Sequence, residues 1–187
     1  MIDHEIAGLA DWLRRVTVEV RSGAASRGAG VIWQADGLIV TNAHVATETP
    51  LDVRLPNGRA VPARVVRRDA SWDLAAVRVD ARGLAAVEPA PEVRPGQLIV
   101  AVGHPLGLPG AIALGVVHAV PSSGGHPLDR LLRLDVRLAP GNSGGPVADT
   151  AGRVLGVSTM IVNGLAHAIP SALVARFLEG DWSHKAA

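Results

Sequence analysis

The predicted fold is all-β, and three features of the 187-residue chain point to it. About a dozen short runs rich in Val, Leu, Ile and Ala alternate with turns that contain Gly, Pro and Asn. Asp-Gly and Asn-Gly pairs, which are typical of hairpin turns, join some of these runs. Helical spacing of apolar residues occurs only at the two ends. Short strands at regular intervals predict a β-sandwich or barrel, which we interpret as two antiparallel barrels of six strands each.

The first half of the chain opens with a predicted short helix over residues 3–15, because Ile6, Leu9 and Leu13 recur at helical spacing. Residues 16–21 alternate with period two, as expected of a strand with one buried face. Residues 22–28 predict a flexible loop. The remaining strands of this half are expected at residues 30–33, 38–41, 51–55, 59–66 and 74–79.

The second half repeats this pattern after a stretch rich in Ala, Pro and Gly. Its strands are expected at residues 97–102, 112–120, 131–138, 146–148, 153–161 and 165–169, followed by a short helix that begins at Pro170. The predicted division is an N-terminal barrel (16–82), a connection (83–95), a C-terminal barrel (96–169) and a C-terminal helix (170–179).

The composition excludes several classes of protein. Without cysteine the chain can form neither a disulfide framework nor a thiolate metal site. A formal net charge of +1 provides no electrostatic footprint for nucleic acid or an anionic membrane. No stretch is long and apolar enough to predict a transmembrane helix, and the acidic N-terminus does not resemble a secretory signal. We expect a cytoplasmic protein if Met1 is the natural start, and a periplasmic or extracellular one if the chain has been shortened.

The most informative stretch is residues 140–146, Pro-Gly-Asn-Ser-Gly-Gly-Pro, which follows a predicted strand. Its glycines allow a tight turn and expose main-chain N–H groups beside Ser143. A serine nucleophile needs a neighbouring base, and acyl transfer needs N–H donors aimed at the developing oxyanion. Taken alone, the same residues are equally consistent with a surface turn.

A base and an orienting carboxylate are available upstream. His44 directly follows the strand at residues 38–41, and Asp73 directly precedes the strand at residues 74–79. A rigid strand end suits a general base, and a partly buried carboxylate stabilises its imidazolium form. Other carboxylates that could fill this role are Asp69, Asp80 and Asp135. The order His, Asp, Ser is that of chymotrypsin-type triads, and it predicts a site in the cleft between the two barrels.

The motifs around these three residues occur together in one known family. They comprise residues 30–32, 37–45, 73–75, 102–107, 141–146 and 168–171. On these motifs the chain resembles the protease domain of the HtrA (DegP, DegS, DegQ) family of trypsin-like serine proteases, over residues 16–178. The resemblance implies a chymotrypsin fold in one trypsin-like protease domain spanning residues 1–187, without the PDZ domain that usually follows.

By this resemblance His44 is the general base, Asp73 orients it and Ser143 is the nucleophile of a serine endopeptidase. The oxyanion hole is expected from the N–H groups of Gly141, Asn142 and Ser143. The expected role is HtrA-like protein quality control or regulatory proteolysis, through an acyl-enzyme and without a metal or cofactor. A catalytically silent or partner-activated peptide-binding module is the alternative, and ester hydrolysis is a conceivable side activity.

The resemblance also predicts where a polypeptide substrate binds. The expected substrate-binding residues are Arg137, Leu138, Ala139, Val157, Ser158, Thr159, Ile161 and Ala166. The family implies a small aliphatic P1 residue (the residue before the cleaved bond), whereas Arg137 would favour an acidic one if it lined the P1 pocket rather than facing solvent. The substrate is expected to lie extended along residues 156–159.

The sequence also suggests which partners the chain binds and where it departs from the family pattern. We expect polypeptide substrates, no nucleic acid and no membrane; by resemblance the chain could form a homotrimer through Leu9, Trp12 and Leu13, which could equally pack on their own barrel. His104 stands where the family commonly has Asn, and His167 where it usually has Phe.

Overall fold

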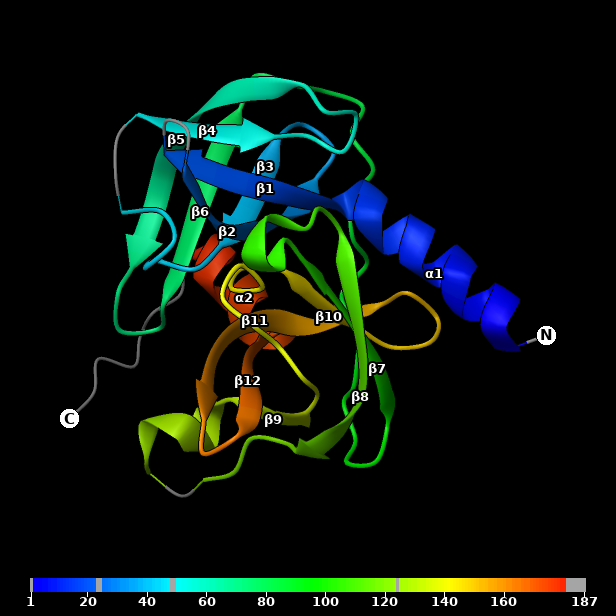
Figure 1. Ribbon diagram of the computed structural model, residues 1–187. Coiled ribbons are helices and arrows are strands. Elements are labelled where there is room, and N and C mark those ends of the chain that lie inside the picture. The colour runs from blue at the N-terminus through cyan, green and yellow to red at the C-terminus, as the bar shows by residue number, and fades with distance from the viewer. Residues whose placement is uncertain (1, 23–24, 48–49, 124, 181–187) are drawn as a thin grey trace.

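The two predicted barrels are present in the computed structural model, which describes residues 2–22, 25–47, 50–123 and 125–180. The N-terminal barrel closes in the order β1-β2-β3-β6-β5-β4, and the C-terminal barrel in the order β10-β11-β12-β9-β8-β7. All of these strand pairs are antiparallel. Figure 1 shows the first barrel above the second. The prediction of an all-β double barrel is therefore confirmed.

The N-terminal barrel encloses a core made only of Val, Ile, Leu and Ala, as the scarcity of aromatic residues predicts. Its strands are β1 (Thr17–Ser22), β2 (Ala25–Gln34), β3 (Leu38–Thr41), β4 (Leu51–Arg54), β5 (Ala60–Asp69) and β6 (Leu74–Val79). The predicted loop over residues 22–28 is wrong in its second half. Residues from Ala25 onward pair with β1, with Ser22 opposite Ala25 and Val20 opposite Gly28, so β2 starts earlier than its apolar pattern suggests.

The C-terminal barrel has a similar aliphatic core. Its elements are β7 (Leu98–Gly103), η1 (Pro105–Gly107), β8 (Ala111–Ala119), η2 (Pro127–Arg130), β9 (Leu132–Asp135), β10 (Pro146–Ala148), β11 (Val154–Val162) and β12 (Leu165–Pro170). The strand predicted over residues 131–138 ends at Asp135 instead. Residues 136–139 leave the sheet and lead into the serine loop, so they are available to shape the site.

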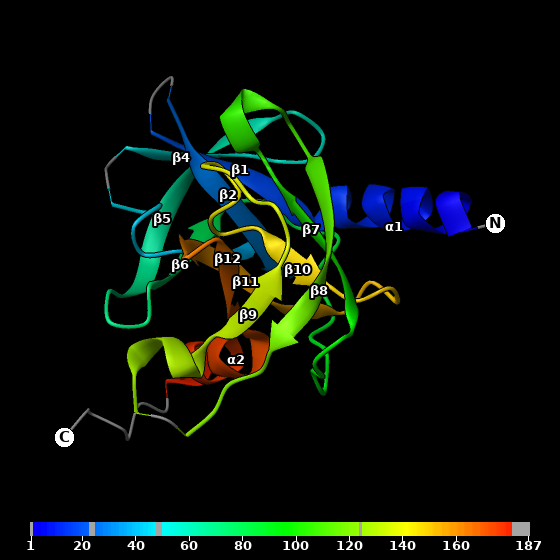
Figure 2. The ribbon, with the colours of Figure 1, turned by 60° about the horizontal axis from the view of Figure 1, so that its bottom comes forward.

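The two helices cover different parts of the molecule. Helix α1 (Ile2–Val16) projects from the barrels, as Figures 1 and 2 show, and only its last turns are buried. There Leu13 and Val16 pack with Val100 and Val154, and Leu9 and Trp12 lie against the same cluster. These residues therefore pack on their own C-terminal barrel. No helix in the described part of the chain has the length and apolar character that a membrane span requires.

Helix α2 (Ser171–Glu179) closes the seam between the two barrels. Val174 and Phe177 are fully buried in a cluster that includes Val40 of β3 and Val157 of β11. The guanidinium of Arg67, from β5, lies 5.2 Å from the centre of the Phe177 ring. The helix ends at Gly180, whose φ of 88° suits a left-handed C-cap. Apolar packing thus fixes the two barrels relative to each other and shapes the cleft between them.

Candidate active site

His44 lies in a tight turn directly after β3. The N–H groups of Val45 and Ala46 both donate to the carbonyl of Asn42 at 3.2 Å, which closes the turn. The amide of Asn42 in turn donates to the main-chain carbonyl of Asp73 at 3.1 Å. The imidazole is 52% exposed. The turn therefore presents His44 to solvent on a backbone that neighbouring residues hold in place.

Asp73 faces His44 because β3 and β6 are adjacent antiparallel strands, with Thr41 opposite Ala75. Its carboxylate accepts hydrogen bonds from Nδ1 of His44 at 2.8 and 2.9 Å and from the His44 main-chain N–H at 3.0 Å. A carboxylate only accepts, so the proton of a neutral imidazole must sit on Nδ1. Nε2 is consequently left with a lone pair, as a general base requires.

The backbone of Asp73 is unusual. Its φ is 53°, in the left-handed region that residues other than glycine seldom adopt. Such a conformation costs on the order of 1–3 kcal/mol and is retained only where the surroundings enforce it. Here four hydrogen bonds to Asp73 enforce it, three to the carboxylate oxygens from His44 and one to the carbonyl from Asn42. These bonds hold the Asp73 carboxylate against Nδ1 of His44.

A further donor to Asp73 comes from the other barrel. The hydroxyl of Thr159, in β11, donates to the second carboxylate oxygen at 2.5 Å. Burial raises the pKa of the Asp73 carboxyl, but the hydrogen bonds from His44 and Thr159 outweigh it and hold the pKa below its ordinary value. Asp73 is thus a carboxylate at neutral pH. The role of Thr159 was not anticipated, since nothing in the sequence connects two residues 86 positions apart.

Ser143 sits in a loop that both barrels hold. From the N-terminal barrel, the N–H of Ala29 donates to the Ser143 carbonyl at 2.8 Å. From the C-terminal barrel, the Ser158 hydroxyl donates to the carbonyl of Asn142 at 2.6 Å. Gly144 has a φ of 86°, and a Cβ there would collide with the carbonyl of Ala29. Glycine at this position is therefore what allows the serine loop to approach the first barrel.

The hydroxyl of Ser143 donates to the carbonyl of Thr159 at 3.0 Å. Within the described residues no hydrogen bond joins it to His44. Thr159 nevertheless connects the two halves, because its hydroxyl binds Asp73 and its carbonyl binds Ser143. The structure thus links the His44–Asp73 pair to Ser143 through Thr159, with the serine hydroxyl bonded to the Thr159 carbonyl.

The main chain before Ser143 is oriented by the loop that follows β7. The carbonyl of Pro140 accepts from Leu106 N–H at 3.2 Å, and that of Gly141 accepts from His104 N–H at 3.0 Å. Because N–H and C=O point in opposite directions across a peptide bond, the Gly141 N–H faces away from this loop. Among the described residues neither it nor the Ser143 N–H donates to a protein acceptor.

Asn142 differs from the other two expected oxyanion donors. Its N–H donates to the carbonyl of Ala139 at 3.1 Å, and its side-chain amide donates to the same carbonyl at 3.0 Å. This N–H closes the turn and is not free to bind an oxyanion. The expectation that Asn142 contributes a donor therefore needs correction, whereas Gly141 and Ser143 retain available N–H groups.

A pocket of about 230 Å³ opens beside Ser143. It is lined by Leu138, Ala139, Pro140, Asn142, Ser143, Ser158, Thr159, Met160 and Ile161. Five of the eight expected substrate-binding residues are therefore in its wall, and Pro140 and Met160 were missed. Arg137 is exposed and does not line the pocket, while Val157 and Ala166 lie in the apolar cores. An apolar wall without Arg137 gives no support to an acidic P1 residue.

The expected edge for an extended substrate also shifts along β11. Gly156 and Val157 pair with β10 and β12 on both sides, so they have no free edge. The pairing with β12 slips between Ser158 and Ile161. Met160 and Ile161 are exposed at 41% and 51%. Residues 159–161 are thus the part of the strand that remains open to a peptide.

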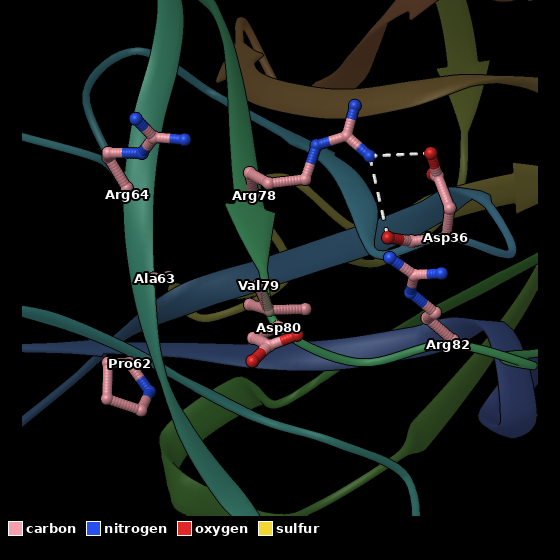
Figure 3. A pocket seen from close by; sticks show the side chains of 8 residues that line it. All are labelled: Asp36, Pro62, Ala63, Arg64, Arg78, Val79, Asp80 and Arg82. Carbon is pink, nitrogen blue, oxygen red and sulfur yellow. Dashed lines mark hydrogen bonds and ion pairs between the residues drawn. The ribbon is translucent and has the colours of Figure 1, made fainter.

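A second, polar hollow of about 600 Å³ lies on the N-terminal barrel (Figure 3). Asp36 forms an ion pair with Arg78 at 2.8 Å on its rim. Asp36 precedes β3 and Asp80 follows β6, whereas His44 follows β3 and Asp73 precedes β6, so the hollow is at the opposite end of these strands. Its wall contains no serine or histidine. In the described residues no group of three His, Asp or Glu could hold a metal ion.

Comparison with known proteins places the fold and the cleft in one family. Residues 28–157 match the family described as the trypsin-like peptidase domain. The chain belongs to this family. The match includes His44, Asp73 and Ser143, and it ends within β11, just before residues 158–161, which form part of the pocket wall.

The relatives of the chain are HtrA-type proteases, so the resemblance inferred from the motifs is confirmed. The chain is 34% identical over 170 residues to a probable periplasmic serine endoprotease DegP-like of Chlamydia pneumoniae, covering 85% of this chain and 35% of that protein. It is 37% identical over 166 residues to the mitochondrial serine protease HTRA2 of Drosophila pseudoobscura pseudoobscura, covering 83% of this chain and 39% of that protein. The chain thus spans well under half the length of these relatives.

A solved structure shows the same fold. The HtrA-type protease AlgW, determined with a decapeptide, superposes with a TM-score of 0.83, covering 92% of this chain and 67% of that one. The sequences are 24% identical in this alignment. At that level the likeness supports the double-barrel architecture.

Proposed function

We propose that this domain is a serine endopeptidase that cleaves polypeptides through an acyl-enzyme. The observation that carries the proposal is the hydrogen bonding of His44. Asp73 fixes the proton on Nδ1 and leaves Nε2 as a base, while Thr159 links Asp73 to Ser143, beside which two N–H groups are available. These are the parts that acyl transfer requires.

In the proposed first step, Ser143 rotates its hydroxyl from the Thr159 carbonyl toward His44. Oγ attacks the substrate carbonyl carbon while Nε2 of His44 takes the hydroxyl proton. The negative charge moves to the carbonyl oxygen, which the N–H groups of Gly141 and Ser143 stabilise. Asp73 remains ionised and stabilises the imidazolium. The C–N bond then breaks, and His44 returns its proton to the departing amine.

In the second step, water hydrolyses the ester formed at Ser143. His44 takes a proton from the water molecule as the water oxygen attacks the acyl carbon. The same two N–H groups stabilise the second oxyanion. The ester C–O bond breaks, Oγ recovers the proton from His44 and the carboxylic acid leaves. The pocket of about 230 Å³, with its apolar wall, supports a small or medium aliphatic P1 residue.

A partner- or substrate-activated form of the same enzyme is the second candidate. The hydrogen bond from Ser143 to the Thr159 carbonyl favours it, since the hydroxyl must leave this acceptor before His44 can deprotonate it. An extended peptide brings its own main-chain N–H groups to residues 159–161. A substrate N–H bound at the Thr159 carbonyl would displace the serine hydroxyl and turn it toward His44.

Cleavage-site profiling tests the proposal. Wild type and Ser143→Ala are incubated with an unfolded protein such as reduced casein, and new termini are identified by mass spectrometry. We expect cleavage after aliphatic residues by wild type alone. Equal cleavage by both proteins, or none by wild type even with added candidate partners, contradicts the proposal. A preference for Asp or Glu at P1 contradicts the assignment of the pocket.

A further inference from the structure

A continuous series of hydrogen bonds connects the N-terminal helix to Gly141, whose N–H is one of the two proposed oxyanion donors. The series begins at Arg14 in the last turn of α1. Its Nε donates to the carbonyl of Gly110 at 2.9 Å, across 96 residues of sequence. A Cβ on Gly110 would lie 3.1 Å from the Arg14 side chain, which shows how closely the two pack. The arginine therefore ties the loop between β7 and β8 to the helix.

The second connection runs through the ring of His104. The N–H of Gly110 donates to its Nδ1 at 3.3 Å. Because Nδ1 accepts here, the ring proton must lie on Nε2 and the imidazole must be neutral. His104 and Gly110 are the two ends of the loop, so this bond closes it. The apolar side chains of the loop contribute little packing, since Leu106 and Leu108 are 80% and 62% exposed.

The closed loop then orients the two peptide groups on either side of Gly141, two residues before Ser143. His104 N–H donates to the Gly141 carbonyl, and Leu106 N–H donates to the Pro140 carbonyl. Leu106 adopts a φ of 53° to do so, a strained conformation for leucine. A Cβ on Gly141 would collide with the His104 carbonyl, so the two segments are in direct contact. Both carbonyls thereby point at this loop, and the Gly141 N–H points away from it.

We propose that Arg14 and His104 are positioning residues for the oxyanion hole: they hold residues 103–110 in the one arrangement that keeps the carbonyl of Pro140 out of the cleft. The inference rests on the proposed function, because an oxyanion forms only if Ser143 attacks a carbonyl. Neither side chain lines the pocket beside Ser143. Loss of either one should therefore slow catalysis without weakening substrate binding.

The chain offers matched substitutions for each position. His104→Leu removes the acceptor of the Gly110 N–H. His104→Asn keeps one, since Oδ1 of asparagine occupies the place of Nδ1 on the same Cγ. Arg14→Ala removes the bond to Gly110. Arg15→Ala removes a neighbouring exposed arginine of the same helix, whose side chain forms no hydrogen bond within the described part of the chain.

Steady-state hydrolysis of a peptide with an aliphatic P1 residue is measured for the full chain and each variant. We expect His104→Leu and Arg14→Ala to lower kcat by about 10-fold with KM unchanged, a smaller loss than the roughly 10²–10³-fold of deleting an oxyanion donor. His104→Asn should recover most of the lost rate, and Arg15→Ala should match wild type. If His104→Leu does not fold, as judged by its thermal melt, Arg14→Ala and His104→Asn still decide the outcome.

The possible failures are distinguishable. If the wild-type protein hydrolyses no peptide, the proposed function itself is contradicted. An active wild type with unchanged kcat in Arg14→Ala and His104→Leu overturns only the positioning role. So does a change confined to KM, or an equal loss in Arg14→Ala and Arg15→Ala, since neither reports on the oxyanion hole.

Discussion

The two barrels hold the proposed catalytic residues in different ways. In the N-terminal barrel, His44 and Asp73 are already joined by two side-chain contacts under 3 Å, and their turns flank adjacent strands. In the C-terminal barrel, Ser143 points its hydroxyl at the Thr159 carbonyl instead of at His44. In the proposed mechanism the base is therefore complete before substrate arrives, whereas the nucleophile still has to turn.

This difference has a physical origin. His44 and Asp73 meet through β-sheet pairing within one barrel, which is locally determined and rigid. Ser143 depends on contacts from both barrels: Ala29 on one side and Thr159 on the other. A residue held from both barrels, such as Ser143, changes position when the barrels shift relative to each other or when a ligand binds between them. We therefore expect perturbations of the seam to act on the serine loop and to leave the His44–Asp73 pair unchanged.

The largest loss of kcat is expected from Asp73→Asn, which disrupts the His44–Asp73 pair. The amide of asparagine can donate its N–H to Nδ1 of His44, which leaves the ring proton on Nε2. His44 then has the wrong tautomer for a base, and kcat should fall by about 10⁴-fold. Peptide hydrolysis at saturating substrate measures it. Asp135→Asn, at an exposed carboxylate of β9, is the matched control and should leave kcat unaltered. A fall under tenfold for Asp73→Asn means that another group orients the base.

Breaking the seam should have a smaller effect. In Gly144→Ala the new Cβ collides with the Ala29 carbonyl and the Thr41 hydroxyl, so the serine loop must move away from the first barrel. A displacement of about 1 Å costs on the order of 10² in rate. Gly58→Ala is the control, because Gly58 has a similar φ of 84° and no atom within 4 Å of its Cβ position. Equal kcat losses in the two variants would attribute the effect to backbone strain alone.

A single bridging hydrogen bond should matter less again. Thr159→Val removes the hydroxyl that donates to Asp73, so the pKa of the Asp73 carboxyl should rise and kcat should fall roughly 10-fold. Thr159→Ser restores the donor and should recover the rate. The pH dependence of kcat distinguishes this from a packing defect, since only the loss of the donor moves the acid limb upward.

The smallest predicted effect concerns stability against pH. Burial lowers the pKa of His104 below its ordinary 6.5, helped by Arg54 and opposed by Glu19 and the Val18 main chain. The unfolded chain then binds the proton more readily, so stability is complete above about 6.5 and decreases as the pH falls from 6.5 through the folded pKa. Urea unfolding at pH 7.5 and 5.5 should show a smaller difference for His104→Asn than for wild type. An identical difference in both proteins would mean that the pKa of His104 is the same in the folded and the unfolded chain, which contradicts the lowered pKa.

The fold could be predicted from the sequence because its signals are local. Turn residues recur at short intervals, so the strands and the two barrels follow from the pattern. The nearness of His44 and Asp73 follows from the same pattern, since both flank strands that pair. The start of β2 was missed because Gly28 and its neighbours carry no alternation, and they pair only because β1 supplies partners.

Three features of the site were not predicted, and two of them depend on contacts between different strands. Thr159 reaches Asp73 from the other barrel. Asn142 loses its free N–H to a turn whose closure depends on how residues 136–139 leave β9. Met160 enters the pocket wall because the pairing of β11 with β12 slips at this point. The Asn142 contact is local, between residues three positions apart, but no pattern of residue types along one segment reports on the other two.

Covalent labelling of Ser143 tests the central claim most directly. A fluorophosphonate probe is added to the full chain, with and without an unfolded protein, and the modified peptide is located by mass spectrometry. The account predicts a single adduct on Ser143, formed faster when substrate releases the hydroxyl from Thr159, and none in Ser143→Ala. An adduct on another residue, or no adduct under either condition, would contradict it.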